Sequence, residues 1–124
     1  MPTSGALAGS RTASERITQE VTSWPGVEAG PGRRGGFAFR VGRRDIGHLH
    51  GDHAAHFSFP KTVWAELIQA GRIGPHPVFP DARGPAARRI GSEEDIRDVI
   101  ALLRLNYDRV GGGDAGERRG DETR

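Results

Sequence analysis

Four of the five histidines of this chain lie within nine residues, and this cluster is where the sequence could do chemistry. The clustered residues are His48, His50, His53 and His56, and the fifth histidine is His76. A neutral imidazole takes up protons near neutral pH and is the commonest metal ligand in proteins. The spacing therefore predicts either acid–base chemistry or a metal site.

The elements expected to position these histidines are two strands, residues 44–50 and 53–59, joined by a tight turn at Gly51 and Asp52. A two-residue turn fixes the register, so His50 is expected opposite His53. Side chains alternate along a strand, so His56 and Asp45 are expected on the other face of the hairpin. The face of interest is predicted to carry His48, His50, His53, Phe57 and Phe59.

Three interpretations of this histidine face remain open. The first is a solvated strand face on which the imidazoles have no special role. The second is a divalent metal held by His48, His50 and His53 with an open coordination position. The third is a general base that removes a proton from a hydroxyl group or an enol.

His76 lies between Pro75 and Pro77, which restrict the backbone on both of its sides. Such a rigid loop suits an imidazole that is positioned for catalysis, and equally one that caps a nearby carbonyl group. Phe57, Phe59 and Phe79 are the predicted apolar contacts of a substrate.

The remaining pattern predicts an α+β fold: a small antiparallel sheet of about four to six strands with helices packed on one side. Thr12 and Glu15 form a capping-box pattern at the start of a helix, Pro60 opens a second helix, and Ser92 caps a third. Further short strands are expected at residues 27–29, 37–41, 78–80 and 87–90. The expected single domain spans residues 12–110, between disordered segments at 1–11 and 111–124.

The composition excludes several classes of protein. The 124 residues include no cysteine, which excludes disulfides, thiolate metal sites and a cysteine nucleophile. No apolar run is long enough to span a membrane, and no signal-peptide core is visible, so a cytoplasmic protein is expected. The net charge is only +2. The arginine pairs of the chain are scattered rather than gathered on one face, which disfavours nucleic acid as a partner.

Several segments of the chain resemble a known protein family. The run from Arg44 to His53 resembles the Arg-Glu-Ile-Ala-His-Met-His-x-x-His run of the fungal luciferases, which belong to a luciferase-domain family with small bacterial members. The helix at residues 64–71 with the following His76-Pro77, and the segment 92–107, also resemble that family. The resemblance covers about residues 14–110.

The resemblance implies an oxidoreductase of the monooxygenase type. Fungal luciferases oxidise a hydroxylated styryl-pyrone with molecular oxygen and without a flavin or other known organic cofactor. Carried over to this chain, the family's histidines correspond to His48, His50, His53 and His76, and His56 matches none of them.

Two functions are therefore carried forward. The first is a cofactor-independent oxygenase or acid–base enzyme that uses His48, His50, His53 and His76 on an enolic or phenolic small molecule, with oxygen as co-substrate. The second is a non-catalytic module that binds a ligand or DNA, similar in element order to YjbR-like domains. It would use Arg33, Arg34, Arg43 and Arg44. The sequence does not indicate an oligomeric state.

Overall fold

The computed structural model describes residues 11–32 and 36–111. Apart from Arg11 and Gly111, the segments predicted to be disordered lie outside the described residues. In chain order the elements are α2 (Ala13–Thr22), β1 (Val27–Pro31), β2 (Phe37–Val41), β3 (Arg44–His50), β4 (Ala54–Ser58), α3 (Lys61–Gln69), β5 (Gly74–Pro75), β6 (Pro85–Arg89) and α4 (Glu93–Arg109).

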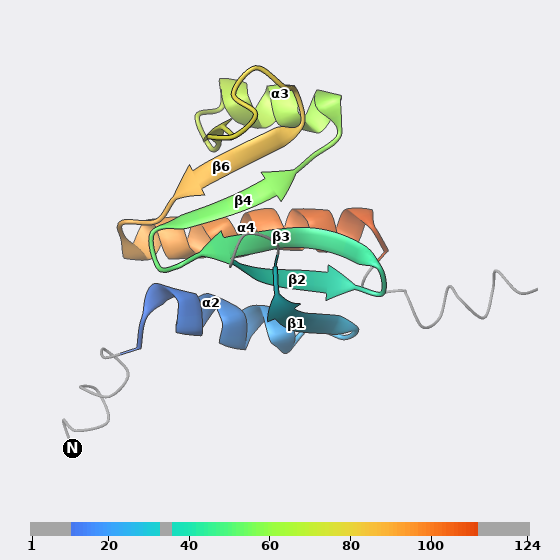
Figure 1. Cartoon of the computed structure of the whole chain (residues 1–124), viewed down its shortest axis with the longest axis vertical. Helices are drawn as coiled ribbons and strands as arrows, with labels where there is room; N and C mark the ends of the chain where they lie inside the picture. The colour runs from blue at the N-terminus through green and yellow to red at the C-terminus, as the bar shows by residue number, and fades with distance from the viewer. Residues whose placement is uncertain (1–10, 33–35, 112–124) are drawn as a thin grey trace, which may run out of the picture.

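The strands form one antiparallel sheet in the order β1-β2-β3-β4-β6-β5, which confirms the predicted α+β class. Helix α4 runs behind the sheet and contacts β3, while α2 contacts both α4 and β1 (Figure 1). Helix α3 lies at the end of the sheet beside β4 and β6 (Figure 1). One face of the sheet is thus covered by α2 and α4, and the other face is left for a site.

The helix starts predicted from Thr12 and Ser92 agree with the structure. Thr12 and Glu15 form a reciprocal capping box before α2, and the Ser92 hydroxyl accepts the Asp95 N–H before α4. Helix α3 begins at Lys61, with Pro60 at the N-cap, one residue later than predicted.

The core fills the space between the sheet and the helices α2 and α4. Its largest fully buried side chains include Tyr107, Phe39, Ile17, Ile46, Leu49, Leu102 and Leu103. The Tyr107 hydroxyl donates a 2.6 Å hydrogen bond to the Pro25 carbonyl, so this buried ring keeps a polar partner. Burial of this apolar surface is what holds α4 against the sheet and keeps β3 and β4 in place.

The predicted strand at residues 78–80 is wrong. These residues form bends and a turn, and the two-residue β5 pairs with β6 instead. Pro77 and Pro80 have no N–H to donate to a strand ladder, which explains why the segment stays irregular. The strand predicted at 87–90 is β6, shifted towards the N-terminus.

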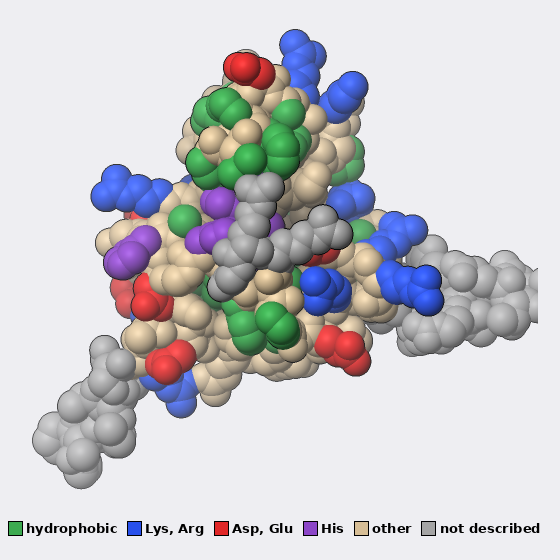
Figure 2. Space-filling view, viewed as in Figure 1, with side chains coloured by type: hydrophobic (Ala, Val, Ile, Leu, Met, Phe, Trp, Pro, Cys, Tyr) green, Lys and Arg blue, Asp and Glu red, His purple; other side chains and the backbone are tan. Residues whose placement is uncertain are grey.

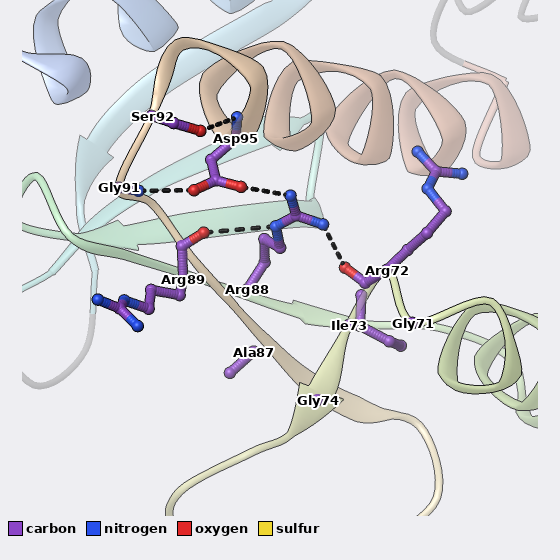
Figure 3. Close-up of a pocket in the computed structure, with 10 residues that line it drawn as sticks. All are labelled: Gly71, Arg72, Ile73, Gly74, Ala87, Arg88, Arg89, Gly91, Ser92 and Asp95. Atoms are coloured by element: carbon purple, nitrogen blue, oxygen red, sulfur yellow. Dashed lines mark hydrogen bonds and ion pairs between the residues drawn. The ribbon is translucent and has the colours of Figure 1, made fainter.

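A hollow of about 690 Å³ lies where β6 meets the start of α4, and Arg88 lies along it (Figure 3). The Arg88 guanidinium donates to Asp95 and Asp98, both at 2.6 Å, and to the Arg72 carbonyl at 2.9 Å. These acceptors satisfy the Arg88 guanidinium. We therefore interpret the contacts along this hollow as structural ones that hold β6, α4 and the segment after α3 together.

Candidate active site

The β3–β4 hairpin has a three-residue turn, residues 51–53, rather than the predicted two-residue turn. His48 therefore pairs with His56 and His50 pairs with Ala54. The predicted register, with His50 opposite His53, is wrong by one residue. Such a slip exchanges the two faces of a strand. It brings His56 onto the face of His48 and His50, and it leaves His53 exposed in the turn.

The rings of His48, His50 and His56 are packed against one another on this face. The ring centroids of His50 and His56 are 4.2 Å apart, and His48 lies 5.0 Å from His50 and 5.3 Å from His56. His56 is only 8% exposed. Three imidazoles from two adjacent strands thus share one partly desolvated space.

His76 joins this group from the irregular loop after β5, as predicted. Its ring centroid lies 4.4 Å from that of His56. Its Nδ1 accepts the Val78 N–H at 3.1 Å, so in the neutral ring Nε2 carries the proton. His76 is therefore placed as a hydrogen-bond donor among the other imidazoles, and it is buried.

A cavity of about 270 Å³ opens beside these rings. Figure 2 shows histidine side chains gathered in the middle of this face, below a group of hydrophobic side chains. Val78 and Phe79 are about half exposed and line one side of the cavity, with the Phe79 ring 5.3 Å from that of His76. The lining residues are Gly32, Ala38, Arg40, Asp45, His48, His50, His56, His76, Val78 and Phe79.

A β-bulge places Asp45 at the cavity, contrary to the prediction that it lies on the other face. The β2–β3 register shifts between Phe39 and Arg40, and Ile46 is left without a partner. Ile46 is buried in the core, so Asp45 turns to the side of His48. The Asp45 carboxylate accepts the Gly47 N–H at 2.8 Å, which fixes its position.

Phe57 and Phe59 lie on the opposite face of the sheet from the clustered histidines, in the core. They are 3% and 4% exposed, and neither lines the cavity. Of the three aromatic residues predicted to contact a substrate, the structure brings only Phe79 to the cavity. The same one-residue error in register explains the difference, because Phe57 alternates with His56 along β4.

Burial keeps two of the imidazoles uncharged at neutral pH. Burial, together with the neighbouring His50, His76 and His48, lowers the pKa of His56 to about 4. Burial also lowers the pKa of His48, while the nearby Asp45 charge opposes that shift. A neutral imidazole has a lone pair that can take a proton or bind a metal.

The structure also identifies which side chains could share a metal ion. Among the described residues, the candidate ligand atoms of His48, His50 and His56 all lie within 4.8 Å of one another. His53, which the sequence placed in this set, is not part of the group. The cluster can thus act as a base, a hydrogen-bond donor or a set of metal ligands.

His56 is the main residue that the sequence reasoning missed, although the sequence contained a signal for it. Leu49, Ala55 and Phe57 are buried apolar residues of the hairpin, and they belong together on the core face. Placing them there requires the observed register and brings His56 beside His48.

The alternative of a DNA-binding module depends on four arginines. Arg33 and Arg34 lie outside the described residues, and Arg43 and Arg44 are exposed around the β2–β3 turn.

Within residues 11–32 and 36–111, no helix is long and apolar enough to cross a membrane.

Residues 43–106, just over half of the chain, match the sequence model of the Luciferase domain family. The matched segment includes β3, β4 and all five histidines. Neither the curated proteins nor the solved structures gave a match.

Proposed function

This chain belongs to the Luciferase domain family, and we propose that it is a small oxygen-dependent enzyme that acts on an enolic or phenolic molecule in the histidine cavity. The observation that carries this proposal is the packing of four imidazoles, from β3, β4 and the loop after β5, beside one cavity. Such polar rings stabilise a core less than apolar side chains of the same size would. Their grouping therefore favours a chemical role.

The size of the cavity limits the substrate. Ligand pockets usually measure roughly 300–1,000 Å³, and the described residues enclose about 270 Å³. This volume suits a molecule with a single ring. Phe79 and Val78 offer an apolar surface to that ring, while the imidazoles and Arg40 meet its oxygen atoms. We therefore propose a one-ring enol or phenol as the substrate class.

The first step of the proposed reaction is the removal of a proton. An uncharged imidazole of the cluster takes the proton of the substrate hydroxyl, which leaves an enolate or phenolate and an imidazolium. The protonated Nε2 of His76 donates a hydrogen bond to the anion, and the positive charge of Arg40 at the cavity stabilises it further.

The second step is the reaction with oxygen. The electron-rich carbon of the anion gives its electrons to molecular oxygen and forms a carbon–oxygen bond. The resulting peroxide anion takes the proton back from the imidazolium, so substrate and oxygen combine into a substrate hydroperoxide. The balance requires no further oxidant or reductant.

An oxygen electrode tests this proposal, with triacetic acid lactone as a one-ring enol and catechol as a one-ring phenol. We expect substrate-dependent oxygen uptake by the wild-type protein. His50→Ala and His56→Ala should lower the rate by about 10²–10⁴-fold, the usual effect of removing an acid–base group. His53→Ala is the matched control, because it removes an exposed imidazole from the same hairpin.

Two results would contradict the proposal. Unchanged oxygen uptake by His56→Ala would show that the cluster does not perform the chemistry. Binding of both probes in the cavity without any oxygen uptake would favour a non-catalytic ligand carrier instead.

A further inference from the structure

The three imidazoles of His48, His50 and His56 have the arrangement of a metal-binding face. His48 and His56 are directly opposed on neighbouring strands, and His50 follows two residues after His48 on the same face. Nitrogen ligands around one zinc ion lie roughly 3.3 Å apart, given Zn–N distances near 2.0–2.1 Å. The candidate ligand atoms lie within 4.8 Å of one another, so small side-chain rotations would bring them to one ion.

We propose that His48, His50 and His56 bind one divalent first-row transition metal ion, with a remaining coordination position open to the cavity. This inference rests on the proposed function for what the metal would do: a bound ion would occupy the imidazole lone pairs, so the substrate proton would pass to a hydroxide at the open position instead of to an imidazole. The binding itself rests on the geometry of the three side chains alone.

The chemistry of the ligands selects the class of metal. Imidazole nitrogens suit zinc, copper, nickel, cobalt and ferrous iron, whereas calcium and magnesium require oxygen ligands. The three rings contribute no carboxylate oxygen and no charge of their own.

His76 is poorly suited to be the fourth ligand. Its Nδ1 accepts the Val78 N–H, so its Nε2 carries a proton in the neutral ring. It lies beside His56, at the edge of the same cavity. A fourth position would therefore be left for water or for a substrate oxygen, with His76 as a hydrogen-bond donor nearby. An open position of this kind is typical of catalytic rather than structural metal sites.

Asp45 supplies a negative charge beside the proposed site. Its charge acts on His48, and its carboxylate is held by the Gly47 N–H. Carboxylates close to metal-bound histidines usually orient the rings and strengthen binding. Arg40 also lines the cavity and is the cross-strand partner of Asp45, so the two charges offset each other near the ion.

The test uses the full chain without an affinity tag, first freed of metal by a chelator. Cobalt(II) is titrated in and followed by its visible d–d absorption, and zinc(II) binding is measured by calorimetry. We expect one ion per chain for the wild type and for His53→Ala. His48→Gln, His50→Ala and His56→Ala should each weaken cobalt binding by roughly 100-fold or more, since each removes one of three ligands.

Circular dichroism and thermal unfolding show whether each variant is folded. His48 and His50 are only half-buried, so their substitution should disturb folding less than substitution of the buried His56. The inference is overturned by the absence of stoichiometric cobalt binding to the wild type. It is also overturned if a folded His48→Gln or His50→Ala protein binds cobalt as tightly as the wild type.

Oxygen uptake separates this inference from the proposed function. Stoichiometric cobalt binding without turnover of any probe would support the metal site and contradict the enzyme. Turnover by a wild-type protein that binds no metal would support the enzyme and overturn the metal site.

Discussion

His56 on β4 lies directly across from His48 on β3, and their ring centroids are 5.3 Å apart. This single cross-strand pair determines which histidines can act together. It turns His50 towards the same space and leaves His53 exposed in the turn. Every function considered for the cavity therefore depends on the register of one hairpin, and that register is set by the apolar residues on the opposite face.

The aromatic residues of β4 and of the cavity should behave differently on mutation. Phe57→Ala removes a ring that is 3% exposed, so we expect it to lower the free energy of unfolding by roughly 3–5 kcal/mol. Phe79→Ala removes a ring that is 49% exposed, and we expect a change of about 0.5 kcal/mol or less. Phe79→Ala should instead weaken the binding of triacetic acid lactone. Urea denaturation and calorimetry check both effects, and a stability loss at Phe79 matching that at Phe57 would contradict the described faces.

Gly47 allows β3 to approach α4. A Cβ atom at this position would lie 2.5 Å from Leu103 Cδ2 and 3.1 Å from Phe57 Cδ1, and the backbone has φ of 151°. We expect Gly47→Ala to cost about 1–3 kcal/mol, as other overpacked core substitutions do. Gly42→Ala is the control, because Gly42 has φ of 62° but no atom within 4 Å of the added Cβ. Thermal unfolding that showed equal costs at both positions would argue against the close approach.

Asn106 connects α4 to both strands that carry histidines. Its side-chain amide donates to the Ile46 carbonyl at 3.2 Å and to the Ser58 carbonyl at 3.1 Å, and the residue is fully buried. Asn106→Ala leaves both carbonyls without this donor, so we expect a loss of roughly 2–4 kcal/mol in chemical denaturation. Arg109→Ala removes only a donor to the Asn106 side-chain oxygen and should cost much less. Equal losses in the two variants would be inconsistent with this role of Asn106.

The metal-free protein should lose stability in mild acid. The pKa of His56 is lowered from 6.5 to about 4, first by burial and then by His50, His76 and His48. Between these pH values the unfolded chain takes up a proton at His56 and the folded chain does not, so stability falls as pH falls through this window. The full difference corresponds to about 3 kcal/mol.

Urea denaturation between pH 7 and pH 4, in the presence of a chelator, measures this effect. His56→Gln should reduce the dependence on pH, and His48 should contribute in the same direction, because burial lowers its pKa as well. His53→Gln is the matched control, because it removes an exposed imidazole from the same hairpin. A wild-type stability that stayed constant over this range would contradict the burial of the cluster.

Local signals in the sequence were sufficient for the fold class. The capping residues Thr12 and Ser92 mark the starts of α2 and α4, and apolar periodicity identifies the buried side of α4. The hairpin could be located from its strand pattern, but its turn length could not be read from Gly51 and Asp52. A two-residue and a three-residue turn both tolerate glycine with positive φ, and Gly51 has φ of 66°.

The candidate site was predictable only in part for the same reason. His48 and His50 are identified by residue type and spacing, His76 is added by the family resemblance, and the structure brings the three together. Whether His53 or His56 completes the group depends on packing against α4, which lies far along the chain. The position of Asp45 depends on a bulge at Ile46 that no local sequence motif predicts.

The most direct test of the four-histidine cavity is an NMR titration of protein labelled with ¹⁵N at the histidine rings. Triacetic acid lactone is added to the metal-free protein, and the ring signals of all five histidines are followed. We predict that the signals of His48, His50, His56 and His76 shift together and that those of His53 stay unchanged. This prediction is contradicted if the signals of His53 shift with those of His48 and His50 while the signals of His56 do not shift.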